Sequence, residues 1–177
     1  MPREEAIMSD TTAKEVTNRH EHCMEIALQA VPSKLRVTGG KEIPFCRAIL
    51  SIRNTGDTAV EGFVPHATLA QEGGSVQDVT EALSRSKTVA SILPGNAVEW
   101  DVYDLLLAGH PGVASKVNLW GYKAILNWWY NLAVWAECQS SDAATPLQPS
   151  VSRWKLRWIT AKPTLEEVDL SIESVED

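Results

Sequence analysis

The most constraining feature of this sequence is a run of alternating residues from Tyr122 to Cys138. Its nine even-numbered positions all carry apolar or aromatic side chains: Tyr122, Ala124, Leu126, Trp128, Tyr130, Leu132, Val134, Ala136 and Cys138. Successive side chains of a β-strand point to opposite faces, whereas a helix would scatter these residues around its circumference. The run therefore predicts a long strand with one face in the core, and it places Trp128 and Tyr130 in that core.

A straight strand of these 17 residues would span about 56 Å, so we expect it to bend, bulge or divide. The odd-numbered face is mixed, and it carries Trp129 and Trp135 among polar residues. Indole rings are large apolar surfaces that are costly to leave in water. We therefore expect a cover over Trp129 and Trp135, either a helix at 75–86 or another subunit, and both are possible interface aromatics.

Shorter segments predict further antiparallel strands, and several of them alternate in the same way. These segments are 23–30, 46–53, 58–64, 88–93, 98–102 and 154–158. Pro32 is expected to break the first strand. Residues 54–57 form an Asn-Thr-Gly-Asp turn sequence, which predicts a hairpin between the second and third strands. Pro65 then places the end of that hairpin at a sheet edge.

One segment has helical spacing. Apolar residues recur at this spacing from Val76 to Leu83, and Ser75 can cap the helix with Asp78 at the capping-box position. A shorter helical turn is expected at 104–108. The fold class that follows is mainly β or α+β, with an antiparallel twisted sheet or sandwich and one or two short helices covering a face.

Composition divides the chain into three parts. Residues 1–20 are polar and poorly periodic, which predicts a flexible arm, and residues 21–162 predict a single β-rich domain. Residues 163–177 contain six acidic side chains and no basic one, which predicts a mobile acidic tail. A chain of 177 residues is long enough to bury a core in one such domain.

Motifs of the common catalytic sites are absent from the sequence. There is no GxSxG elbow, phosphate-binding loop, GxGxxG fingerprint or HExxH pair. The cluster of His20, His22 and Cys23 has no second ligand pair, so we expect an ordinary arm there and no metal. Asp101 and Asp104 fit helix capping or a solvent face better than acid–base catalysis. We therefore expect a protein that is not an enzyme and has no cofactor or small-molecule substrate.

The sequence also indicates a compartment. Cys23, Cys46 and Cys138 are scattered without CxxC spacing, which favours buried, reduced thiols. The sequence opens without a basic-then-apolar leader, and no apolar run approaches the roughly 18 residues of a membrane span. The cytoplasm is the expected location.

A basic stripe near the C-terminus is the best candidate for partner binding. It consists of Arg153, Lys155 and Arg157, which alternate with large apolar residues in a chain of net charge −7. Cations about 7 Å apart on one strand face can follow phosphates or meet an acidic segment, and a solvated outer face is the alternative. The acidic tail can cover the stripe in the same chain or pair with it in a neighbour, which would make assembly salt-dependent.

The order of elements resembles that of rhabdovirus matrix proteins over residues 45–138. A polar arm precedes a strand at 45–53, a sheet-covering helix at 75–83 follows, and Gly121-Tyr122-Lys123 opens a long apolar strand. The short length is similar to that of the plant-infecting cytoplasmic members. The resemblance implies a non-enzymatic protein of host cytoplasm and virion that self-associates and condenses the nucleocapsid. Its implied partners are the nucleocapsid protein and the membrane or a glycoprotein tail.

Two further readings stay open. Alternating strands with Asn-x-Gly and Pro-Gly turns also fit an immunoglobulin-like β-sandwich that serves as an adaptor or ligand-binding module in the cytosol. A two-sheet sandwich without a covering helix would favour that reading. An enzyme with an unrecognised site is the third reading, and a deep pocket with converging polar side chains would favour it.

Overall fold

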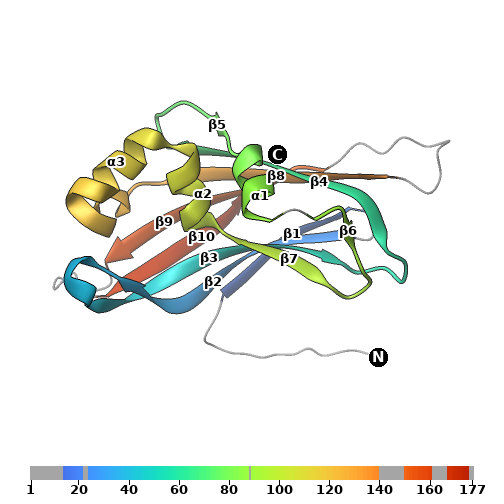
Figure 1. The fold of residues 1–177 in the computed structure, drawn as a ribbon, viewed down its shortest axis with the longest axis horizontal. Helices are drawn as coiled ribbons and strands as arrows, with labels where there is room; N and C mark the ends of the chain where they lie inside the picture. The colour runs from blue at the N-terminus through green and yellow to red at the C-terminus, as the bar shows by residue number, and fades with distance from the viewer. Residues whose placement is uncertain (1–13, 22–23, 88, 140–149, 161–166, 176–177) are drawn as a thin grey trace.

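The computed structural model describes residues 14–21, 24–87, 89–139, 150–160 and 167–175. Across these residues, two antiparallel sheets face each other, and three α-helices lie along one side of the pair (Figure 1). The sequence-based prediction of a mainly β or α+β sandwich with short covering helices is therefore confirmed.

The first sheet has four described strands in the order β1-β2-β3-β7. Their bounds are Lys14–Glu21 for β1, Met24–Arg36 for β2, Glu42–Asn54 for β3 and Ala97–Asp101 for β7. The 3-10 turn η1, Thr38–Gly40, joins β2 to β3. The prediction of a flexible arm is wrong for 14–20, because this segment pairs with β2 along its backbone. Backbone pairing needs no apolar pattern, so side-chain periodicity did not indicate it.

Pro32 does not break β2 as expected. The strand runs through it, and Pro32 lies opposite Cys46 of β3. On its other side, the last described pair of β1 with β2 is Lys14 with Ala30, so no described strand pairs with Pro32 there. A proline is tolerated at such an edge position, because its missing N–H removes no ladder bond.

The second sheet has six described strands in the order β10-β9-β8-β4-β5, and β6 also pairs with β4. The bounds are Val60–Gln71 for β4, Gln77–Asp78 for β5, Ser91–Ile92 for β6, Tyr130–Gln139 for β8, Ser152–Thr160 for β9 and Val168–Val175 for β10. The prediction of a mobile tail is wrong for Val168–Val175. This segment pairs with β9 over eight positions, and it buries Val168 and Leu170.

The segments predicted as a hairpin lie in different sheets. β3 belongs to the four-stranded sheet and β4 to the six-stranded sheet, so the hairpin prediction is wrong. The buried side chain of Asn54 organises the crossing: its amide nitrogen donates to the carbonyls of Thr58 and Ile92, and its oxygen accepts from the Gly56 N–H. These bonds turn the chain from one sheet into the other.

The long alternating run forms two elements instead of one strand. Gly121–Ile125 is the 3-10 helix η2, and β8 begins only at Tyr130. Asn127 adopts a φ of 70°, and its N–H donates to the Trp158 carbonyl at 2.7 Å, which turns the chain between the two elements. As a result Trp128 is 51% exposed, and its predicted place in the core is wrong. Tyr130 is buried as predicted.

The helices fill the side between the two sheets. They are α1, Thr80–Ser86; α2, Val102–Gly109; and α3, Pro111–Trp120. α1 packs on β4, and α2 packs on β3 and β7. The predicted cap at Ser75 is wrong, because β5 occupies 77–78 and the Asp78 carboxylate accepts from the Thr80 N–H at the start of α1. The sequence analysis expected a turn within α2 and did not anticipate α3.

Large aromatic residues join the two sheets at the centre of the core. The Trp158 indole N–H on β9 donates to the Cys46 carbonyl on β3 at 2.8 Å. The Phe45 ring lies parallel to the Trp158 ring, with centroids 6.3 Å apart, while Tyr103 and Tyr130 meet Trp158 edge-on. The predicted inward face of the last strand is confirmed, since its large apolar side chains are all buried: Trp154, Leu156 and Trp158.

Candidate partner-binding face

The basic stripe lies on the outer face of the six-stranded sheet. Arg153, Lys155 and Arg157 project from β9 on the side opposite the buried core residues, and all three are half-buried. The predicted orientation of the stripe is therefore confirmed. The Nε atom of Arg157 is buried and has no hydrogen-bond partner among the described residues, so its guanidinium is held partly out of water.

The stripe is packed on Trp129. The guanidinium carbon of Arg157 lies 4.5 Å from the centroid of the Trp129 ring, and the Lys155 ammonium lies 5.0 Å from it. A cation over an indole ring is attracted by the negative face of the ring. The Glu72 N–H donates to the Trp129 carbonyl at 2.8 Å, and the Glu72 carboxylate lies 4.0 Å from the Lys155 ammonium. One aromatic ring thus positions two of the three cations.

Trp135 has a different neighbour on the same face. It lies directly opposite His66 in the β4–β8 ladder, and the two rings stack with centroids 5.2 Å apart and planes 7° apart. The His66 Nε2 lies 3.5 Å from the Glu137 carboxylate. Within the chain, side chains of neighbouring strands cover part of Trp129 and Trp135, and the expected helix does not. Cover by another subunit stays a prediction. Both tryptophans are still half-exposed to solvent.

Carboxylates surround the stripe on this outer face. Glu173 is exposed on β10 and lies directly opposite Lys155 in the β9–β10 ladder. Glu72 follows β4 and approaches Lys155, whereas Glu137 lies on β8 beyond its last pair with β9; their side chains are 55% and 58% exposed. Part of the acidic tail therefore runs beside the stripe in the same chain, which was one of the two arrangements expected. The outer face therefore carries both signs of charge, with the basic row of β9 next to Glu173 on β10 and near Glu72 after β4.

A shallow hollow of about 250 Å³ lies between the two tryptophans on this face. Its floor contains two cross-strand pairs with small side chains, Thr68 with Ala133 and Ala70 with Asn131. Val76 stands at its rim and is 65% exposed. The sequence analysis missed the hollow, although the small side chain of Ala133 on a face with two tryptophans was a signal for it.

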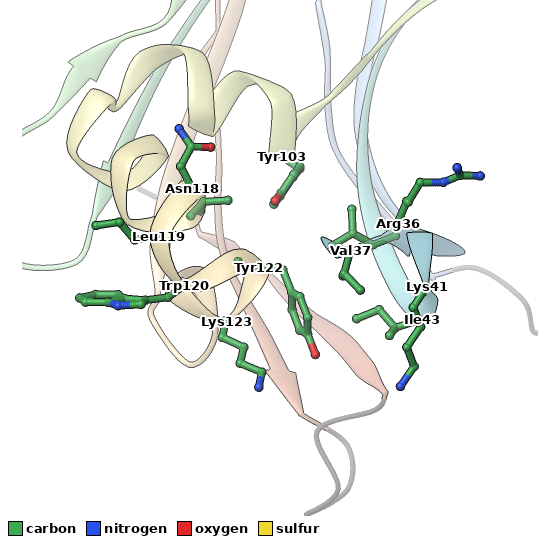
Figure 2. A pocket seen from close by; sticks show the side chains of 13 residues that line it. Arg36, Val37, Lys41, Ile43, Tyr103, Asn118, Leu119, Trp120, Tyr122 and Lys123 are labelled. Carbon is green, nitrogen blue, oxygen red and sulfur yellow. The ribbon is translucent and has the colours of Figure 1, made fainter. Parts of the chain in front are cut away.

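A larger cavity of about 600 Å³ lies at one end of the molecule (Figure 2). It opens between the η1 end of the four-stranded sheet and the junction of α3 with η2. Tyr103 and Tyr122 line it and are mostly buried. Trp120 also lines it, but it is 64% exposed and points away from the cavity in Figure 2.

The carboxylate pair considered for catalysis has a structural role. Asp101 caps α2 by accepting from the Tyr103 N–H at 2.9 Å, and it accepts from Arg47 Nη1 at 2.8 Å. Burial raises the pKa of Asp101, while Asp104 points to solvent. Within the part of the chain that the structure describes, no group of three His, Cys, Asp or Glu side chains could hold a metal ion. His22 and Cys23 lie outside the described residues.

No helix among the described residues is both long and apolar enough to cross a membrane. No protein-family model, no curated protein and no solved structure matches this chain.

Proposed function

We propose that this protein is a non-enzymatic assembly protein that self-associates through the outer face of its six-stranded sheet. The observation that carries the proposal is the packing of Arg157 and Lys155 on Trp129, with exposed carboxylates on both sides. Tryptophan and arginine are the residues most enriched among those that dominate interface energetics. A face that holds them in fixed positions is suited to binding another protein surface.

The charge pattern supports a second copy of the chain as the partner. In a two-fold symmetric interface the same patch is used by both subunits, so it must be complementary to itself. The outer face meets this condition because it carries cations on β9 and exposed carboxylates beside them, Glu173 on β10 and Glu72 after β4. Such contacts between exposed charges are screened by salt, so self-association should weaken as ionic strength rises.

The matrix-type role is the more specific form of this proposal. In that form the assembled protein acts in the host cytoplasm and the virion, where it bridges the nucleocapsid to the membrane or to a glycoprotein tail. Its support is the order of β3, α1 and β8 along the chain, which follows the order of the elements in the resemblance. The self-association proposal does not depend on it.

An adaptor is the second candidate function. The two-sheet packing favours it, because sandwiches of this kind often present one sheet face or one end to a different protein. The three helices along the open side are the feature that an immunoglobulin-like sandwich lacks. An adaptor of this kind would be a monomer at every salt concentration, whereas an assembly protein would not.

A matched pair of triple variants tests the proposal. Arg153, Lys155 and Arg157 are changed together to Ser in one variant, and the exposed Lys34, Lys87 and Lys116 in the other. Both variants lose the same positive charge, but only the first alters the stripe. Sedimentation velocity should show that the stripe variant is monomeric and that the control assembles like the wild type. Equal assembly of all three proteins would show that the stripe is only a solvated face.

A further inference from the structure

The hollow on the outer face has small side chains on its floor and one exposed apolar side chain at its rim. Thr68, Ala70 and Ala133 form the floor, and Val76 stands beside them and is 65% exposed. Val76 follows a turn, residues 72–75, in which every residue is exposed. Exposed apolar surface that is rimmed by polar residues often marks a site of protein contact. The rim and the floor together offer both halves of an apolar contact.

The pairing register places Val76 on the same face as the floor, displaced toward one edge of the sheet. Asp78 of β5 lies opposite Thr68 of β4, so Val76 lies beside Ala70. On the other side of β4, Ala133 of β8 lies opposite Thr68. Residues directly opposite each other in a ladder project from the same face of the sheet. A protrusion and a hollow therefore lie side by side across the strands.

A protrusion beside a hollow is complementary to a second copy of the same surface. A half-turn about an axis that lies between the two features, parallel to the strands, places Val76 of each copy over the floor of the other. Such an isologous contact uses the same patch of both copies, so each half of the contact occurs twice. The hollow has a volume of about 250 Å³, which leaves room for a branched aliphatic side chain. The shape of the outer face therefore fits a second copy of this chain.

The same half-turn also matches the charges on the two sides of the hollow. The turn before Val76 and strand β5 carry Glu72 and Asp78 and no basic residue. On the opposite side, β9 borders the hollow with Arg153 and Lys155. The Glu72 carboxylate lies 4.0 Å from Lys155 of its own chain and is 55% exposed, so it can also meet the stripe of a second copy. The rotation brings the acidic turn of each copy to the basic strand of the other, and opposite charges favour this arrangement.

We infer that two copies of this chain associate with Val76 of each inserted into the hollow of the other, next to Ala133. This inference rests on the proposed self-association and names the contact that sets its register. The outer face carries both signs of charge and can pair with itself in more than one way. Insertion of an apolar side chain into a matching hollow stabilises only one of these arrangements, because burial gains most when the side chain leaves water completely. The exposed charges on both sides add the salt-dependent part of the attraction.

Two complementary variants of the full chain test this inference by sedimentation velocity at low salt. Val76→Gly removes the protrusion and Ala133→Leu fills the hollow. Each variant alone should raise the protein concentration needed for half-assembly by about tenfold or more, because both contacts of the pair are lost. An equal mixture of the two should assemble like the wild type. In the mixed pair, the filled hollow faces the chain without a protrusion, and the open hollow receives the intact Val76.

Leu93→Gly is the matched control, because Leu93 is also an exposed apolar residue, at 58%, but does not line the hollow. It should assemble like the wild type. Thermal melting shows whether each variant folds, and Thr68→Leu fills the same hollow from β4 if Ala133→Leu does not fold. Wild-type assembly of either single variant, or a mixture that assembles no better than its components, would overturn the inference and leave the proposed self-association standing. A wild-type chain that is monomeric at every salt concentration would overturn both.

Discussion

The guanidinium carbon of Arg157 lies 4.5 Å from the centroid of the Trp129 ring, although the two residues belong to segments separated along the chain. The contact exists because β8 and β9 pair with Tyr130 opposite Leu156, which brings the preceding Trp129 beside Arg157. Lys155 joins from two positions away on the same strand face. The pairing register of two strands thus converts an alternating basic stripe into a fixed aromatic and cationic surface.

A double-mutant cycle measures this contact. Trp129→Ala and Arg157→Ser are each expected to destabilise the fold, and their effects should be coupled by about 0.5–1 kcal/mol, the usual strength of a cation–π contact near the surface. The measurement is urea denaturation of the wild type, the two single variants and the double variant, at concentrations where the chain is monomeric. Strictly additive effects would show that the ring and the guanidinium do not interact in solution.

Two core tryptophans provide a matched comparison. The Trp158 indole N–H donates across the sandwich to the Cys46 carbonyl, whereas the Trp154 indole N–H is buried without a hydrogen-bond partner among the described residues. Trp158→Phe should therefore lower the free energy of unfolding by about 1–3 kcal/mol more than Trp154→Phe does. Denaturation of both variants by urea gives the difference. Equal losses would mean that the bond between the sheets contributes nothing.

Asn54 should be sensitive to any substitution. Its buried side chain makes three hydrogen bonds to backbone groups where the chain crosses between sheets. Asn54→Ala leaves those groups unpaired and should lower the free energy of unfolding by at least about 2 kcal/mol. Asn96→Ala, at an exposed position in the next turn, should have almost no effect. Similar denaturation midpoints for the two variants would contradict the assigned role of Asn54.

Tyr130 should make stability depend on pH in the alkaline range. Burial raises the pKa of Tyr130 to about 12, from an ordinary value near 10. The folded state holds the Tyr130 proton more tightly than the unfolded state does. The resulting contribution to the free energy of unfolding is complete below pH 10 and is lost as pH rises through about 12. Tyr130→Phe should remove this part of the alkaline loss, as followed by urea denaturation at a series of pH values. Parallel pH profiles for wild type and variant would exclude it.

The sequence predicted the elements whose side-chain pattern is local. In β9, Trp154 and Trp158 alternate with the basic stripe, so the sequence predicts which side chains face the core and which face outward. This prediction needs no knowledge of the neighbouring strands. The segment from Tyr122 shows the limit of such reading. Its period continues through η2 and β8, and only the left-handed backbone of Asn127, held by a bond to β9, divides it.

The sequence also did not predict which distant segments pair with each other. Residues 54–57 have a hairpin sequence, yet the buried bonds of Asn54 direct the chain into the opposite sheet. β1 and the end of β10 contain few apolar residues and are strands because their backbones pair with β2 and β9. The outward direction of the stripe residues could be predicted from alternation within β9. Their contact with Trp129 could not be predicted, because it depends on the pairing register of β8 and β9.

Sedimentation velocity of the full wild-type chain in rising salt is the most direct test of self-association through the outer face. Between about 0.1 M and 1 M salt, the Debye length falls from about 10 Å to about 3 Å, which screens contacts between exposed charges. We expect oligomers at the low end of this range, at micromolar protein, and dissociation toward monomer at the high end. A monomer at every salt concentration, or an oligomer whose size does not respond to salt, would contradict assembly through the charged outer face.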